Sequence, residues 1–135
     1  MRILLFMAAG AAVILSGCTR QTEAAITVGV IPPPVDKHDV TFATDIKPIF
    51  DAACIKCHGA DKQKAELRLD SREGVLKGSE DGPVFEVGKS ALSILVTNVA
   101  RVGDEDDWMP PIDKGKPLTV EQVALIRAWI DQGAK

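Results

Sequence analysis

The run Cys54-Ile55-Lys56-Cys57-His58 holds the side chains of this chain that are best suited to chemistry. Two thiols two residues apart, followed directly by a histidine, form the pattern that attaches haem c. Each thiol then joins one vinyl group of the same haem, and the histidine is held under the iron as an axial ligand. The pattern therefore predicts one covalent haem c on Cys54, Cys57 and His58.

Two other kinds of site can use such a pair of cysteines. A zinc site needs four ligands, but the only other cysteine is Cys18 and the only other histidine is His38. A redox-active dithiol of the thioredoxin type would follow a strand and begin a helix, whereas the residues before Cys54 have the pattern of a helix. Haem attachment is favoured over both alternatives.

Residues 1–17 have the features of a lipoprotein signal peptide. Arg2 is followed by an apolar stretch that ends in Leu15-Ser16-Gly17-Cys18, which resembles a lipobox. We expect Cys18 to be lipidated and to become the first residue of the mature protein. The apolar stretch is short for a membrane span, and the alternative is an uncleaved N-terminal anchor. Either way we expect an exported protein on the periplasmic side of a membrane, with the outer membrane slightly favoured by Thr19.

Composition limits the remaining classes of protein. Lipid on Cys18 and haem on Cys54 and Cys57 would leave no thiol of the three cysteines for a disulfide. The mature chain would have 118 of the 135 residues, which suits one small domain. Without Arg2, 15 basic side chains face 19 acidic ones, so the net charge is near −4 and nothing indicates a nucleic-acid partner.

We divide the chain into a signal peptide (1–17), a lipidated cysteine with a flexible, proline-rich tether (18–40), and a folded domain (41–135). Apolar spacing predicts a helix over residues 44–53, begun by Thr44 or Asp45, and a helix over 91–100, begun by Ser90. A capping box at Thr119 predicts a last helix that ends near Gly133. With no long alternating strands, the fold class is all-α, with three to five helices and long loops.

Met109 is the only methionine left once the signal peptide, with Met1 and Met7, is removed. Pro110 and Pro111 stiffen the chain after it, so a strap without secondary structure can hold its thioether in place. A histidine and a methionine on the iron are typical of electron transfer. A core-filling role for Met109, ligation by His38 and an open sixth position are the alternatives.

Several stretches occur in the order and spacing of one known family. They are residues 42–50, 54–59 and 67–74, then Gly82-Pro83, Gly88-Lys89-Ser90, Met109-Pro110-Pro111, Leu118-Thr119, residues 128–131 and Gly133-Ala134. On these stretches, residues 42–134 resemble the planctomycete-type cytochrome c domain, a branch of the class I cytochromes c.

The resemblance implies a class I cytochrome c-like fold around one haem, with His58 as the proximal and Met109 as the distal iron ligand. It also implies that the first and last helices cross near one haem edge, where Phe50 and Trp129 would be in contact. Further aliphatic side chains are expected to wall the haem: Leu67, Leu69, Leu92, Leu95 and Ile112.

The function that follows is electron transfer by a lipid-anchored, monomeric, single-haem protein that is not an enzyme and exchanges electrons with redox partner proteins. An open sixth position would instead indicate a peroxidase or gas-binding protein, although no distal histidine or arginine is evident. A structural or sensory haem module is the other alternative. The acidic run Asp104–Asp107 is either a solvated loop or a surface that attracts basic partners.

Overall fold

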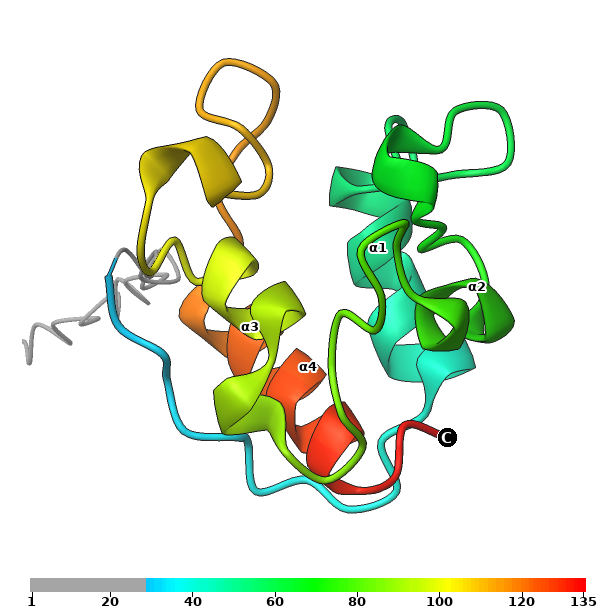
Figure 1. Cartoon of the computed structure of the whole chain (residues 1–135). Coiled ribbons are helices and arrows are strands. Elements are labelled where there is room, and N and C mark those ends of the chain that lie inside the picture. Colours follow the sequence, from blue (N-terminus) through cyan, green and yellow to red (C-terminus); the bar gives the residue numbers. More distant parts are fainter. Residues whose placement is uncertain (1–28) are drawn as a thin grey trace, which may run out of the picture.

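The computed structural model describes residues 29–135, which fold into a helical domain without strands (Figure 1). Its α-helices are α1 (Lys47–Ala53), α2 (Arg72–Lys77), α3 (Ile94–Val99) and α4 (Val120–Asp131). Shorter turns lie between them: the π-helical η1 (Phe42–Ile46) and the 3-10 turns η2 (Lys64–Glu66), η3 (Ser90–Leu92) and η4 (Glu105–Asp107). The architecture agrees with the all-α class expected from the sequence. Within residues 29–135, none of the helices is long and apolar enough to cross a membrane.

The C-terminal helix α4 supplies the centre of the core. Its capping box is present: the Thr119 hydroxyl accepts from the Gln122 N–H at 3.2 Å, and Gln122 Oε1 accepts from the Thr119 N–H at 2.9 Å. Helical spacing places one apolar face of α4 inward, and four of its side chains are fully buried: Val123, Ile126, Trp129 and Ile130.

Phe42 connects the start of the domain to α4. Its ring centroid lies 6.1 Å from that of Phe50 and 5.8 Å from that of Trp129. Phe42 therefore lies between Phe50 and Trp129 in an aromatic cluster, and the Phe85 ring, whose centroid is 5.4 Å from that of Trp129, extends the cluster. Phe42 reaches the core because the first helical segment begins earlier than expected, at η1.

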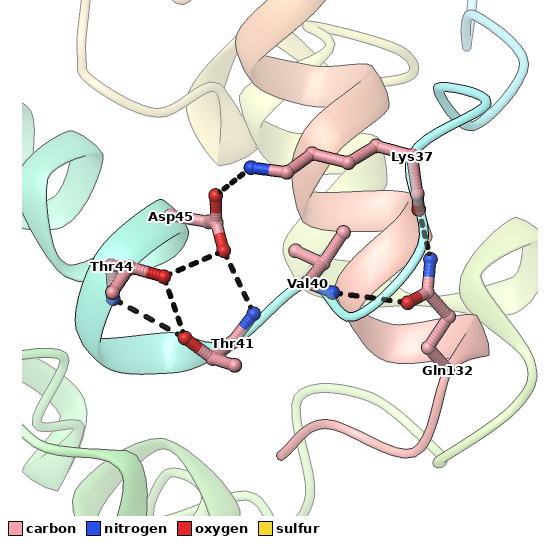
Figure 2. Close-up of polar contacts among 6 residues, drawn as sticks. All are labelled: Lys37, Val40, Thr41, Thr44, Asp45 and Gln132. Carbon is pink, nitrogen blue, oxygen red and sulfur yellow. Dashed lines mark hydrogen bonds and ion pairs between the residues drawn. The ribbon is translucent and has the colours of Figure 1, made fainter.

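Asp45 organises the start of this segment, although it does not cap the helix as expected. Thr41 is the N-cap residue, and the Asp45 carboxylate accepts from the Thr41 N–H at 2.9 Å and from the Thr44 hydroxyl at 2.8 Å. It also pairs with the Lys37 ammonium (Figure 2). These contacts lower the pKa of Asp45 to about 2, chiefly through the Lys37 and Thr41 hydrogen bonds.

Residues 29–40 differ from the free tether expected there, because they lie along α4. The Val35 N–H donates to the Ala124 carbonyl at 3.2 Å, and the Arg127 guanidinium donates to the Pro32 carbonyl. Near the end of α4, the Gln132 amide donates to the Lys37 carbonyl at 2.6 Å and accepts from the Val40 N–H at 3.1 Å (Figure 2). The segment has enough apolar surface for this, since Val40 is buried and Val35 packs against the core.

The helix expected over residues 91–100 is divided into η3 and α3. Ser90 does not cap it, because its N–H and hydroxyl donate to the Asp131 carboxylate at 2.9 and 2.8 Å. Ser93 is the cap instead, and its hydroxyl accepts from the Val96 N–H at 3.2 Å. The change of direction leaves Leu92 outside the core, 80% exposed.

Candidate haem site

The cysteine-histidine run forms a compact turn directly after α1. Cys54 is the C-cap residue of that helix, and its carbonyl accepts from the Cys57 N–H at 3.1 Å and from the His58 N–H at 3.0 Å. Both thiols are free and partly buried. The turn therefore carries the two thiols and the imidazole on one short, internally bonded piece of backbone.

The His58 ring is oriented by the main chain. Its Nδ1 lies 3.1 Å from the Lys64 carbonyl oxygen, so Nδ1 is the protonated nitrogen that donates there. The lone pair of Nε2 is then free to bind a metal, and a second hydrogen bond of this kind is what fixes ligating histidines in general. Partial burial lowers the pKa of His58 and favours the neutral imidazole, which is the ligating form.

The loop after His58 folds back on the turn and holds it through backbone hydrogen bonds. The Lys64 N–H donates to the Cys57 carbonyl at 3.0 Å, and the Leu69 N–H donates to the His58 carbonyl at 2.8 Å. Gly59 is required at the start of this loop, because a Cβ there would lie 2.4 Å from the Ile55 carbonyl oxygen. The loop continues into residues 67–69, in which Leu67 and Leu69 are buried.

Met109 lies in an irregular strap between η4 and α4. Its N–H donates to the Asn98 carbonyl at 3.0 Å, which attaches the strap to the end of α3. The Met109 side chain is partly buried and packs against the same core cluster as Cys54. In Figure 1 the segment after α1 and the segment before α4 extend to the same end of the molecule, on opposite sides.

The residues expected to wall the haem fall into two groups. Phe50, Leu67, Leu69, Leu95 and Trp129 belong to the buried core cluster. Leu92 and Ile112 are exposed, at 80% and 57%. The rival ligand His38 is exposed and lies near the C-terminal end of α4, beside a cavity that Gln132 also lines. The acidic residues Asp104–Asp107 are also exposed, and Asp104 caps η4.

Sequence reasoning missed two side chains near the site. Phe42 was not expected in the aromatic core, although its spacing of four from Ile46 is a helical signal that an earlier helix start would have revealed. Arg101 is 7% exposed, and its Nη2 donates to the Pro110 carbonyl at 2.8 Å. No pattern in the sequence indicates this burial, because an arginine just after a helix is usually solvated.

These side chains suit a covalent haem better than the two alternatives. Burial raises the pKa of Cys54 to about 12, whereas a reactive dithiol needs a lowered pKa. Within residues 29–135, no three His, Cys, Asp or Glu side chains are grouped to hold a metal ion, so zinc lacks its further ligands there. An imidazole with a free Nε2, two adjacent thiols and a thioether on the same core match the donor set of a haem c.

Residues 54–113 match the family described as Planctomycete cytochrome C. This part of the chain is a planctomycete-type cytochrome c domain. The matched span contains all four side chains proposed to hold the haem, from Cys54 to Met109, and confirms the family recognised from the sequence. Searches of the curated proteins and of the solved structures gave no match. Membership of this cytochrome c family indicates a haem c protein of the electron-transfer type.

Proposed function

We propose that this protein is a single-haem electron carrier in which His58 and Met109 fill both axial positions of the iron. The observation that carries the proposal is the turn at Cys54–His58, where the imidazole is held by the Lys64 carbonyl with Nε2 free. Met109 supports it as the only thioether outside residues 1–17, on a strap attached to the end of α3. We also propose that the domain has a class I cytochrome c-like fold around this haem.

The protein residues have separate tasks in this function. The bound haem supplies a metal that gains and loses one electron. Cys54 and Cys57 would hold the porphyrin at the turn that follows α1, and the hydrogen bond to the Lys64 carbonyl would keep the His58 ring in place as a ligand. A neutral thioether from Met109 favours the reduced state, and the apolar core around it limits access of water. With both axial positions filled, the protein would not bind a substrate at the metal.

The chain is further proposed to work outside the cytoplasm, held to a membrane by lipid on Cys18, and to exchange electrons with partner proteins as a monomer. The signal peptide and Cys18 lie outside the described residues, so the support for this part is the sequence pattern of residues 1–18. The mass of the N-terminal peptide of the membrane-bound protein tests it: we expect a lipidated Cys18 as the first residue, whereas an unmodified Cys18 still preceded by residues 1–17 would contradict lipidation.

The electron-carrier function is tested by a redox titration of the purified holoprotein, combined with addition of cyanide to the ferric form. We expect one reversible one-electron step, the weak red absorption of a ferric haem with a thioether ligand, and slow binding of cyanide. Rapid cyanide binding by the native protein would contradict the filled sixth position and would favour the peroxidase or gas-binding alternative. A haem that exchanges no electrons would favour a structural role.

A further inference from the structure

Arg101 occupies an unusual position at the end of α3. Its φ of 54° lies in the left-handed region, and it follows the helix in a Schellman arrangement, with the Val102 N–H donating to the Thr97 carbonyl at 2.9 Å. Glycine adopts this conformation without steric cost. An arginine is kept in this conformation only when contacts of its side chain offset the strain.

The Arg101 guanidinium contacts the residues on both sides of Met109. Its Nη2 donates to the Pro110 carbonyl at 2.8 Å, and its Cζ lies 5.8 Å from the centroid of the Trp108 ring, within the range of a cation–π contact. The Met109 N–H itself is bound to the Asn98 carbonyl, three residues before Arg101. The end of α3 therefore holds three consecutive residues of the strap.

Burial of this side chain is not explained by an ion pair. Arg101 is 7% exposed and takes part in none of the ion pairs among residues 29–135, and its Nε is buried without a hydrogen-bond partner. Burying an unpaired cation is unfavourable, and an apolar side chain would pack at this position with less cost. What an arginine adds is a rigid planar group that can stack on an aromatic ring and donate a hydrogen bond at the same time.

We propose that Arg101 is a positioning residue that holds the Met109 strap so that the thioether stays on the iron. This inference rests on the proposed function, because it requires Met109 to be the distal ligand. Arg101 acts only through Trp108 and Pro110. Its role is to keep the sixth position closed to other ligands.

The test measures the rate at which cyanide binds to the ferric holoprotein, together with the red absorption of the iron–thioether bond and the thermal midpoint. Arg101→Met should raise the cyanide rate about ten- to a hundredfold, as expected for loss of one buried charged hydrogen bond, and should weaken the red absorption. Arg101→Lys should give an intermediate rate, because it keeps a donor but loses the planar group.

Arg72→Met is the matched control. The Arg72 Nε also donates to a main-chain carbonyl, that of Ala134 at 2.6 Å, but away from the strap. It should lower the thermal midpoint and leave the cyanide rate unchanged. If Arg101→Met does not fold, the cyanide rate of Arg101→Gly is compared with that of the wild type instead, since glycine adopts the left-handed conformation of this position without strain.

Equal cyanide rates in the wild type, Arg101→Gly and Arg101→Met would overturn the proposal, and so would an equal increase in Arg72→Met. The variant Met109→Ala shows whether the proposed function fails or only the proposed role of Arg101. If it fails to raise the cyanide rate, Met109 is not the ligand and the proposed function fails. If it raises the rate while the Arg101 variants do not, only the role of Arg101 is lost.

Discussion

The two sides of the proposed iron site are held in different ways. On the proximal side, the turn of Cys54–His58 is held by main-chain hydrogen bonds from the loop that follows it, and even the His58 ring binds a main-chain carbonyl. On the distal side, a single main-chain hydrogen bond, from the Met109 N–H to the Asn98 carbonyl, joins the strap to the end of α3, and side chains supply further contacts: Arg101 donates to the Pro110 carbonyl, and the Trp108 indole donates to the Gly103 carbonyl at 3.3 Å.

This difference indicates where the site tolerates mutation. Main-chain contacts survive the loss of most side chains, so the proximal side should be sensitive only to its ligands and to Gly59, where a Cβ would meet the Ile55 carbonyl. The distal side should be sensitive to side chains that never touch the iron.

His58→Ala should give the largest effect, loss of stable holoprotein. The imidazole is the ligand that the turn is built to present, and no other described histidine lies in that turn. The measurement is the yield of haem-bearing protein from a host that matures c-type cytochromes. A normal yield with an unchanged spectrum would remove His58 from the site.

Met109→Ala should lower the reduction potential and open the iron to added ligands, because a soft neutral ligand is lost. We expect cyanide to bind at least about tenfold faster, equivalent to ~1.4 kcal/mol. Lys116→Ala is the control further along the same strap, since Lys116 is exposed and should change neither quantity. An unchanged spectrum in Met109→Ala would exclude it as a ligand.

Asp45→Asn should destabilise the fold without making either axial position of the iron accessible to added ligands. The Asp45 pKa is lowered to about 2, so its contacts with Lys37 and Thr41 stabilise the protein fully above its ordinary pKa of 3.8. That contribution is lost as the pH falls through about 2. Loss of these charge-assisted bonds should cost about 1–3 kcal/mol at neutral pH.

Urea unfolding of the wild type and of Asp45→Asn at neutral pH and near pH 2 measures this effect. The difference in unfolding free energy between the two proteins should shrink toward the acidic end. A difference that is independent of pH would contradict the assignment to the Asp45 carboxylate.

Lys64→Ala should have the smallest effect, below about 0.5 kcal/mol in stability, as is usual for an exposed side chain. His58 binds the main-chain carbonyl of this residue, which alanine retains. Cyanide binding and the haem spectrum should be those of the wild type. A large change here, comparable to that of Arg101→Met, would remove the contrast between the two sides.

The parts of the fold that were predictable from the sequence depend on local interactions. The capping box at Thr119 and the last helix that follows it are encoded by neighbouring residues, and the structure has both. The haem-attachment pattern is equally local.

The parts that differed depend on contacts between distant residues. Ser90 is used by Asp131, 41 residues away, so it cannot begin the third helix, and α3 starts at Ile94 instead. The contacts of residues 29–40 were not predictable either, because Arg127 and Gln132, which bind this segment, each lie 95 residues beyond the residue that they contact. The burial of Arg101 was also not predictable from the sequence, because its guanidinium meets the Pro110 carbonyl only when the strap is folded.

The proposed function depends on one porphyrin joined to this chain by thioether bonds at Cys54 and Cys57. The direct measurement is the intact mass of protein exported in a cytochrome-maturing host, followed by alkylation and peptide mapping. We expect the mass of the mature chain plus one haem, with both cysteines protected from alkylation and the haem on the peptide that contains His58. A colourless protein in which both thiols react would contradict it.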